Sequence, residues 1–307
     1  MRILLTGATG FIGSAIATEL IARGFEVYAT HRSGSSFDRC QEIRHLLHWI
    51  NTDNANWKEA VKLIQPNLLI HAAWGGVGIQ GRNDWNIQLQ NFYFSKDLFD
   101  LAADCHIQQV IALGSQAEYG STGLVATENT IPQPDDAYGA IKLLTLNYLR
   151  QLFDKTLTSW FWIRVFSVFG EKEQSDWLIP TVIHSLLNQR SIKLTNCEQK
   201  YNYLYINDFT KLLMAVVENS KAEPGIYNLC HSTSFSLKEL LTQLAKLMGV
   251  SEQLLQFGAL PYRPGQNMLI TGDNTKFKEH FNMNETFSED LSYGLIRTIN
   301  YYKKRQQ

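Results

Sequence analysis

The chain has 307 residues, 45% of them hydrophobic, with 28 basic and 29 acidic side chains. This length and apolar content suffice for one large α/β domain with a smaller companion. The balanced charge provides no field that would attract nucleic acid or an anionic membrane, so we expect neither as a partner.

The cysteines and the apolar runs bear on the cellular compartment of the protein. The four cysteines are widely scattered, which predicts reduced thiols and no metal site. No charged and then apolar leader precedes the first predicted strand, and no apolar run approaches 18 residues. We therefore expect a soluble, cytoplasmic protein.

Strand-like and helix-like periods alternate along the first half of the chain, which is typical of a doubly wound parallel α/β sheet. The predicted strands are Arg2–Thr6, Glu26–Thr30, Leu46–Ile50, Leu68–Ala73, Gln109–Leu113 and Ser159–Val165, with helices at Phe11–Arg23 and from near Asp84 and Asp136. Beyond the last strand, prolines punctuate shorter elements. We expect a Rossmann domain over residues 1–165, to which elements from about 200–230 return, and a smaller α/β substrate lobe over 166–307.

The first predicted strand ends in a glycine-rich turn that opens a helix. Its sequence is Gly7-Ala8-Thr9-Gly10-Phe11-Ile12-Gly13, with glycines three positions apart. Glycine lets the backbone touch a pyrophosphate, and free N–H groups at the helix start favour its negative charge. The predicted dinucleotide contacts are Gly7, Gly10, Phe11, Ile12 and Gly13. The alternative is a tight strand-to-helix turn without a ligand.

A second motif, Tyr138-Gly139-Ala140-Ile141-Lys142, predicts a proton donor. A tyrosine with an ordinary pKa near 10 moves protons poorly at neutral pH unless a positive charge stabilises its phenolate. Lys142 lies one helical turn from Tyr138 and on the same face, so it can supply that charge. A Tyr-x-x-x-Lys pair without this context would arise by chance in most proteins.

The glycine turn and the Tyr/Lys pair together resemble the extended short-chain dehydrogenases/reductases of the NAD-dependent epimerase/dehydratase family, and the resemblance covers essentially the whole chain. It implies that Tyr138 and Lys142 are catalytic and also contact the cofactor. Counted back from Gly120, Ser115 matches the family's catalytic serine or threonine, whose hydroxyl polarises the carbonyl. The alternative for Ser115 is a cap at a strand end.

The two residues after Ser115 discriminate between reactions. Family members that dehydrate a nucleotide-hexose have an Asp-Glu pair there, whereas this chain has Gln116 and Ala117, which cannot transfer protons. A 4,6-dehydratase is therefore disfavoured. The run from Gly114 to Gly120 instead resembles that of 4-ketoreductases acting on nucleotide-linked 4-keto-6-deoxysugars.

The end of the second predicted strand bears on the cofactor. An acidic residue there binds the ribose 2′-hydroxyl of NAD, whereas an arginine accommodates the 2′-phosphate of NADP. Here the acid is absent and Arg32 stands beside Ser33, which predicts NADP(H); the alternative is that Arg32 is only a solvated loop charge. The resemblance implies further cofactor contacts at Asp53, Ala72, Ala73, Asn91 and Val165. A helix cap and a polar helix face are the alternatives for Asp53 and Asn91.

The resemblance also implies a nucleotide-sugar site. Its expected contacts are Trp74, Gln116, Ser167, Trp177, Lys200 and Arg263. Arg263 can bind a diphosphate with its planar fork, although a surface arginine needs no such role. One departure is that Tyr201-Asn202 stands where the family usually has Arg-Asp, which removes an expected phosphate ligand. Lys200, or stacking by Tyr201, are the possible substitutes.

These observations predict NADPH-dependent reduction of the C4 keto group of a nucleoside-diphosphate 4-keto-6-deoxyhexose. The product would be a deoxysugar nucleotide for a surface polysaccharide, such as lipopolysaccharide, or for a natural product. The family also implies a homodimer through the helices near Asp84 and Asp136. One alternative is an NDP-hexose 4-epimerase with bound NAD. A second is a non-catalytic NADP-sensing protein, which the intact Tyr/Lys pair disfavours. The sugar, the base and the C4 configuration are not specified by the sequence.

Overall fold

Seven short apolar runs form one parallel sheet in the computed structural model, which describes residues 1–219, 222–283 and 290–306. In the order in which they lie side by side, the strands are β11 (Gly225–Leu229), β6 (Ser159–Val165), β5 (Gln109–Ser115), β4 (Leu68–His71), β1 (Arg2–Thr6), β2 (Glu26–His31) and β3 (His48–Asn51). β4 and β5 are buried throughout, as strands covered on both faces must be. The order reverses between β1 and β4, where doubly wound folds bind ligands. The predicted α/β Rossmann fold is confirmed.

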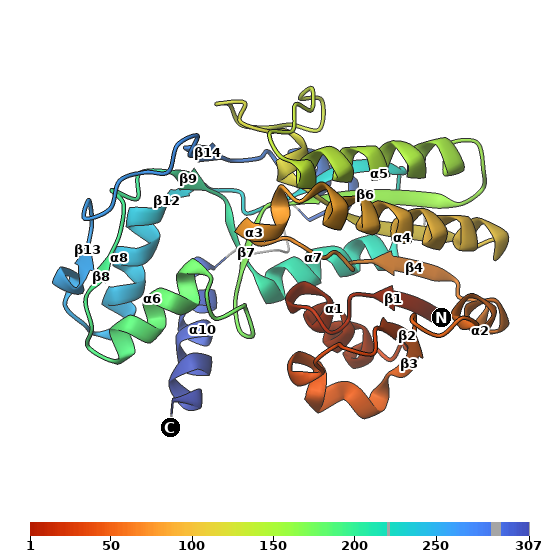
Figure 1. The fold of residues 1–307 in the computed structure, drawn as a ribbon, viewed down its shortest axis with the longest axis horizontal. Helices are drawn as coiled ribbons and strands as arrows, with labels where there is room; N and C mark the ends of the chain where they lie inside the picture. The colour runs from red at the N-terminus through yellow and green to blue at the C-terminus, as the bar shows by residue number, and fades with distance from the viewer. Residues whose placement is uncertain (220–221, 284–289, 307) are drawn as a thin grey trace.

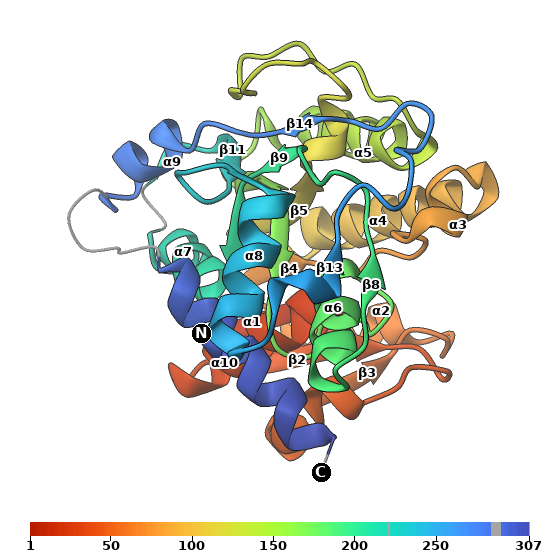
Figure 2. The ribbon, with the colours of Figure 1, turned by 90° about the vertical axis from the view of Figure 1, so that its left-hand side faces the viewer.

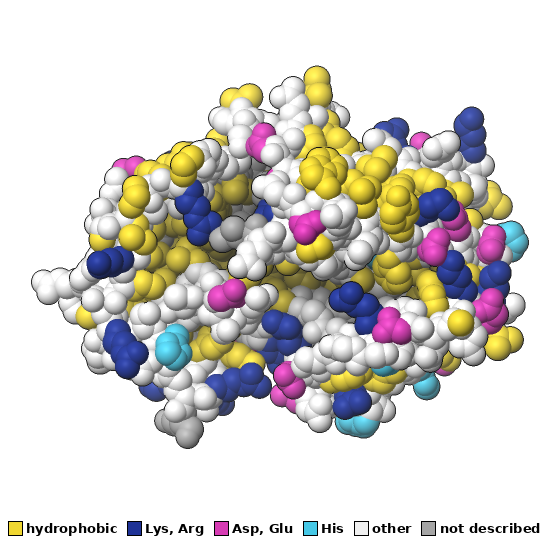
Figure 3. Space-filling model, viewed as in Figure 1, with side chains coloured by type: hydrophobic (Ala, Val, Ile, Leu, Met, Phe, Trp, Pro, Cys, Tyr) yellow, Lys and Arg dark blue, Asp and Glu magenta, His cyan; other side chains and the backbone are white. Residues whose placement is uncertain are grey.

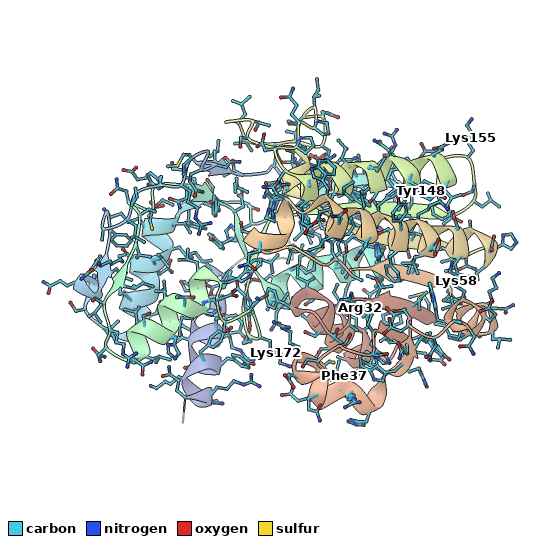
Figure 4. The ribbon with its side chains drawn as sticks, viewed as in Figure 1. Arg32, Phe37, Lys58, Tyr148, Lys155 and Lys172 are labelled. Carbon is cyan, nitrogen blue, oxygen red and sulfur yellow. The ribbon has the colours of Figure 1, made fainter. Side chains whose placement is uncertain are left out.

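Helices cover both faces of this sheet (Figure 1). One face carries α1 (Phe11–Ala22) and α7 (Ile206–Glu218), and the other carries α2 (Trp57–Ile64), α4 (Trp85–Asp104) and α5 (Ala137–Phe153). Asp84 and Asp136 cap the N-termini of α4 and α5 with their side chains, so both helices begin where the sequence predicts. Tyr148 of α5 donates a hydrogen bond to Asp100 of α4 and helps to hold this helix pair together (Figure 4).

Three strand ends differ from the prediction by two residues. β3 begins at His48 rather than Leu46, and β5 continues to Ser115. β4 stops at His71, so Ala72 and Ala73 belong to the following loop. There the Ala73 N–H donates to the Thr6 Oγ1 at 3.2 Å instead of joining the strand ladder.

The second half of the chain adds a smaller lobe beside the carboxyl ends of the strands (Figures 1 and 2). Its helices α6 (Leu178–Leu187), α8 (Leu237–Met248) and α10 (Leu291–Arg305) pack against one another. Its strands are short: β12 (Phe235–Ser236), β9 (Lys200–Tyr201) and β14 (Leu269–Ile270) form one sheet, and β13 (Leu255–Gln256) pairs with β8 (Ile192–Lys193). β7 (Ser167–Phe169) pairs with β10 (Tyr203–Tyr205), and α9 (Thr275–His280) packs on β11.

The lobe and the sheet share one apolar core. A single cluster of buried side chains includes Ile163 of β6, Leu240 of α8 and Leu295 of α10. β11 also joins the sheet although it comes from the second half of the chain. The division into two domains at residue 165 stays a prediction. Among the described residues, none of the helices combines the length and apolar character needed to span a membrane.

Candidate functional site

The glycine turn between β1 and α1 is packed too closely against neighbouring backbone for side chains at Gly7 and Gly13. Gly7 has φ +78°, and a Cβ there would lie 2.7 Å from the Ala73 nitrogen in the loop after β4. A Cβ on Gly13 would lie 2.0 Å from the Gly7 oxygen. Gly10 caps α1 without a side-chain hydrogen bond, and no acidic residue lies in the first turn. The free N–H groups of this turn therefore fit a pyrophosphate.

At the ends of β2 and β3, two predicted cofactor residues contact each other. The Ser33 backbone N–H donates to Asp53 Oδ2 at 2.7 Å, and Asn51 Nδ2 donates to Ser33 Oγ at 3.1 Å. The hydrogen bond from Ser33 lowers the pKa of Asp53. Arg32, which directly follows β2, is exposed (Figure 4).

Asn91 holds the loop that follows β4. Its Oδ1 accepts from the Gly75 N–H at 2.8 Å, and its Nδ2 donates to the Gly75 carbonyl at 2.9 Å. Gln88, one turn earlier in α4, is fully buried and accepts from Trp74 Nε1 at 2.8 Å. The structure thus gives Asn91 a loop-fixing contact, and its predicted contact with the cofactor stays a prediction.

Ser115, Tyr138 and Lys142 come together at the carboxyl end of β5. Ser115 is the last residue of that strand, and the other two lie in the first turns of α5. All three are buried, with 6%, 9% and 4% of their surfaces exposed. The Lys142 Nζ donates to the Leu113 carbonyl at 2.6 Å and lies 3.5 Å from the Trp74 ring centroid. Trp74, predicted as a substrate contact, therefore covers the Lys142 ammonium group.

Burial dominates the electrostatics of this group. It raises the pKa of Tyr138, while a hydrogen bond with Ser115 and the charge of Arg82 oppose that rise. Burial also lowers the pKa of Lys142 to about 7, against the attraction of Glu118. The Tyr138 phenol is therefore protonated at neutral pH and is suited to donate a proton.

A buried ion pair that the motifs did not identify lies beneath Ser115. Glu118 is 0% exposed, and its Oε1 accepts from the Ser115 N–H at 2.8 Å. Trp162 Nε1 donates to the same carboxylate at 2.9 Å, and Arg164 Nε donates to it at 2.8 Å. Gly114 is required here because a Cβ would lie 2.1 Å from Trp162 Nε1. The signal available in the sequence was an arginine inside the apolar strand Ser159–Val165.

A small pocket lies between the start of α5 and the lobe. Its volume is about 180 Å³, and its lining includes Arg82, Gln116, Asp136 and Asn267. Gln116, predicted to contact the substrate, is the residue after Ser115. Arg82 of the four-residue helix α3 (Ile79–Arg82) was not predicted, and its Cζ lies 4.4 Å from the Tyr138 ring centroid. The pocket therefore lies between neighbours of Ser115 and Tyr138 in the chain and the lobe segment around β14.

The remaining predicted substrate residues lie mostly on the lobe. Trp177 caps α6 and is 40% exposed, while Lys200 in β9 and Arg263 before β14 are exposed. Figure 3 shows a hollow between the lobe and the sheet, with lysine and arginine side chains around it. Ser167 is half-buried at the start of β7, and Val165 is buried at the end of β6. No hydrogen bond among the described residues joins these lobe side chains to Ser115.

Tyr201, at the family's arginine position, is mostly enclosed. Gln266 Nε2 donates to its hydroxyl at 3.3 Å, and its ring centroid lies 5.8 Å from that of Tyr203. An aromatic pair thus occupies this part of the lobe. The proposed replacement of the missing phosphate ligand by Lys200 or Tyr201 stays a prediction.

Comparison with known proteins agrees with this geometry. A model of the NAD dependent epimerase/dehydratase family matches residues 3–230. CDP-abequose synthase of Yersinia pseudotuberculosis is 23% identical over 95% of this chain and 98% of its own. dTDP-4-dehydro-6-deoxyglucose reductase of Escherichia coli is 24% identical over 78% and 79%. These matches confirm the resemblance read from the glycine turn and the Tyr/Lys pair.

Solved structures show the same fold. UDP-glucose 4-epimerase of Thermotoga maritima with UDP-glucose superposes with a TM-score of 0.87 at 21% identity, and each chain is fully covered. UDP-glucuronic acid 4-epimerase of Bacillus cereus, in complex with UDP-glucuronic acid and NAD, gives 0.86 at 21% identity over 99% of this chain and all of its own. The names of these proteins all refer to nucleotide sugars.

Proposed function

Because the chain belongs to the NAD dependent epimerase/dehydratase family, we propose that it reduces the C4 keto group of a nucleoside-diphosphate 4-keto-6-deoxyhexose with NADPH. The observation that carries this proposal is the buried Ser115–Tyr138–Lys142 group next to Gln116, which cannot act as an acid or a base. A ketone reduction needs one proton donor, whereas a dehydration needs a second acid and a base. The names of two curated relatives, a 4-dehydro-6-deoxyglucose reductase and a synthase of a CDP-linked sugar, agree with it.

The residues of the site have distinct tasks in this mechanism. The glycine turn would hold the pyrophosphate, and the bound nicotinamide would supply a hydride to C4. Ser115 donates a hydrogen bond to the carbonyl oxygen, and Tyr138 transfers its proton to that oxygen as negative charge develops there. Lys142 adds positive charge near the phenolate. Tyr138 then recovers a proton from solvent, which completes the conversion of a ketone to an alcohol.

The choice of NADPH over NADH rests on the end of β2. No acidic residue follows that strand, and the exposed Arg32 can pair with a 2′-phosphate. The structural neighbour from Bacillus cereus binds NAD, so the cofactor is a point to test. A kcat/KM ratio for NADPH over NADH at or below one would contradict the proposal.

A 4-epimerase is the second candidate, because the solved structures with TM-scores of 0.86 and 0.87 include 4-epimerases. Such an enzyme needs the same serine, tyrosine and lysine but shows no net redox change. The test is to incubate the protein with NADPH and each of a panel of dTDP-, CDP-, GDP- and UDP-linked 4-keto-6-deoxyhexoses. The loss of NADPH absorbance measures reduction, and NMR identifies the products. Oxidation of NADPH with one of them supports reduction. If NADPH is oxidised with none of them and a plain nucleotide-hexose is converted, the result supports epimerisation.

We also expect a homodimer through α4 and α5. These helices expose Trp85, Tyr93 and Leu144, with 55%, 60% and 43% of their surfaces open to solvent. Large apolar side chains gathered on neighbouring helices are typical of a protein interface. Light scattering of the purified protein measures the mass, and a monomer at micromolar concentration would contradict this expectation.

A further inference from the structure

Arg82 lies against Tyr138 although the sequence motifs did not single it out. Its Cζ is 4.4 Å from the Tyr138 ring centroid, and its Nε donates to Asp136 Oδ2 at 2.8 Å. The other oxygen of Asp136 accepts from the Gly139 N–H at 2.7 Å and so caps α5. One aspartate therefore fixes both the helix that carries Tyr138 and the guanidinium that covers the ring.

The backbone around Arg82 is also fixed. The fully buried Gln88 donates through Nε2 to the Gly81 carbonyl at 2.9 Å. Asn83 Oδ1 accepts from the Ala137 N–H at 3.3 Å, so the residues on both sides of Arg82 are tied to α4 or α5. This arrangement distinguishes Arg82 from a surface arginine that samples many rotamers.

Several charged and polar groups face Tyr138. They are the cations of Arg82 and Lys142, the carboxylates of Glu118 and Asp136, and the hydroxyl of Ser115. Burial lowers the pKa of Lys142 to about 7, and its Nζ is directed to the Leu113 carbonyl. A guanidinium keeps its proton at every pH at which an enzyme works. Arg82 is therefore the cation beside Tyr138 whose charge does not depend on pH.

We propose that Arg82 is a positioning residue for Tyr138: held by Asp136, it orients the phenol at the substrate pocket and provides a permanent positive charge beside it. The inference deepens the proposed function, because it rests on Tyr138 being the proton donor. Arg82, Gln116 and Asp136 line a pocket of about 180 Å³, so this pocket borders the guanidinium that covers the ring. The positive charge favours the phenolate that remains after Tyr138 has given its proton away.

The experiment follows the ionisation of Tyr138 in the full chain by NMR of tyrosine labelled with 13C at Cζ. The resonance is assigned by its absence in Tyr138→Phe, and the variants are Arg82→Gln, Arg82→Met and Arg82→Lys. We expect the two neutral replacements to raise the titration midpoint by about 0.5–1 pH unit, and Arg82→Lys, which keeps a positive charge, to raise it less. A purely structural role would not separate the charged replacement from the neutral ones.

The matched control is Arg150→Gln at the far end of α5. Arg150 also pairs with an aspartate, Asp154, with 3.7 Å between Nε and Oδ2, and its loss should leave Tyr138 unchanged. With substrate, kcat of Arg82→Gln should fall about 3- to 10-fold while KM for NADPH stays within twofold. An unchanged midpoint in Arg82→Gln, or a shift in Arg82→Lys as large as that in Arg82→Gln, would overturn the inference. If Arg82→Gln does not fold, Arg82→Met takes its place in this comparison.

The NMR titration needs no substrate, so the two proposals can fail separately. If the wild-type protein reduces no 4-keto sugar and Arg82→Gln still moves the Tyr138 midpoint, the proposed function is wrong and the role of Arg82 stands. If the wild type reduces a 4-keto sugar and the Tyr138 midpoint does not move in Arg82→Gln, the proposed function stands and the role of Arg82 is wrong.

Discussion

Two buried glutamates, one following β5 and one following β7, differ in how they are partnered. Glu118 accepts hydrogen bonds from the Ser115 backbone, from Trp162 and from Arg164. Glu173 is 8% exposed, and among the described residues its Oε2 has no hydrogen-bond partner. Burial raises the pKa of Glu173 to about 8 against a hydrogen bond from the Gly170 backbone. The end of β5 is therefore organised in advance by hydrogen bonds, whereas the segment between sheet and lobe carries a buried carboxyl group with one oxygen that has no hydrogen-bond partner among the described residues.

This difference shows that buried hydrogen bonds of charged side chains are concentrated at the end of β5 rather than in the lobe. Ser115 and Tyr138 must be held within a fraction of an ångström for proton transfer, and a buried network of charged hydrogen bonds provides that. The substrate residues of the lobe, such as Lys200 and Arg263, are exposed. The role proposed for them is to bind a strongly charged diphosphate, and that role requires less precise placement before binding. Substitutions in the two regions should therefore differ in what they damage.

The largest effect is expected at the centre of the organised region. Tyr138→Phe removes the proton donor and leaves the ring, so kcat for 4-keto reduction should fall about 10²- to 10⁴-fold. NADPH binding, measured by fluorescence titration, should stay nearly unchanged. The matched control is Tyr148→Phe, two turns or more along the same helix, where the hydroxyl bonds Asp100 instead of facing the pocket (Figure 4). A Tyr138→Phe variant with near wild-type turnover would refute the acid assignment.

The next effect is on stability. Glu118→Gln leaves Arg164 as a buried charge without its carboxylate, so the free energy of unfolding should fall by about 3–5 kcal/mol in urea titrations. The control is Glu19→Gln, whose partner Arg23 is 2.8 Å away on an exposed surface; its cost should stay below about 1 kcal/mol. Equal losses in the two variants would show that the buried network contributes no more than a surface pair.

At Glu173 we expect a substitution to increase the free energy of unfolding rather than decrease it. Its folded pKa of about 8 lies above the unfolded value near 4.5, so folding takes up a proton between these pH values. The cost of burying this group is absent below pH 4.5, grows as the pH rises toward 8 and is complete above it. Glu173→Gln should therefore stabilise the protein by about 1–3 kcal/mol at pH 9 and change it little at pH 5.

Thermal unfolding at these two pH values measures the Glu173 effect. A variant that is equally destabilised at pH 5 and pH 9 would mean that Glu173 makes contacts in the folded state that its unpartnered oxygen does not indicate. That result would remove the contrast with Glu118.

The sequence predicted the sheet better than the lobe for a physical reason. Strands Arg2–Thr6 and Ser159–Val165 were placed to the residue, because each contains three or four consecutive apolar residues. The lobe strands have two or three residues each and pair across long separations, such as Lys200 with Ser236. No local period identifies such strands, because their partners and not their own composition define them.

The residues around Tyr138 also divide into those that the sequence predicts and those that it does not. The positions of Tyr138 and Lys142 follow from helical spacing alone, so the sequence was sufficient to bring them together. The contact between Arg82 and Tyr138 depends on how the loop after β4 closes onto α4, through contacts such as that of Gln88 with Gly81. A charge that reaches a partner 56 positions away through the tertiary fold has no signature in composition or period.

The smallest effect is expected at the exposed edge of the cofactor site. Arg32→Ala removes one charge-assisted contact with a 2′-phosphate, so the ratio of kcat/KM for NADPH over NADH should fall about tenfold. Since Arg32 is exposed, the loss should shrink as salt is added, because ions screen surface charges. Arg190→Ala, an exposed arginine of the lobe, is the control and should leave the ratio unchanged. If Arg32→Ala keeps the wild-type ratio at low salt, Arg32 is only a solvated loop charge. Cofactor choice would then be made by the Ser33–Asp53 contact or elsewhere along the end of β2.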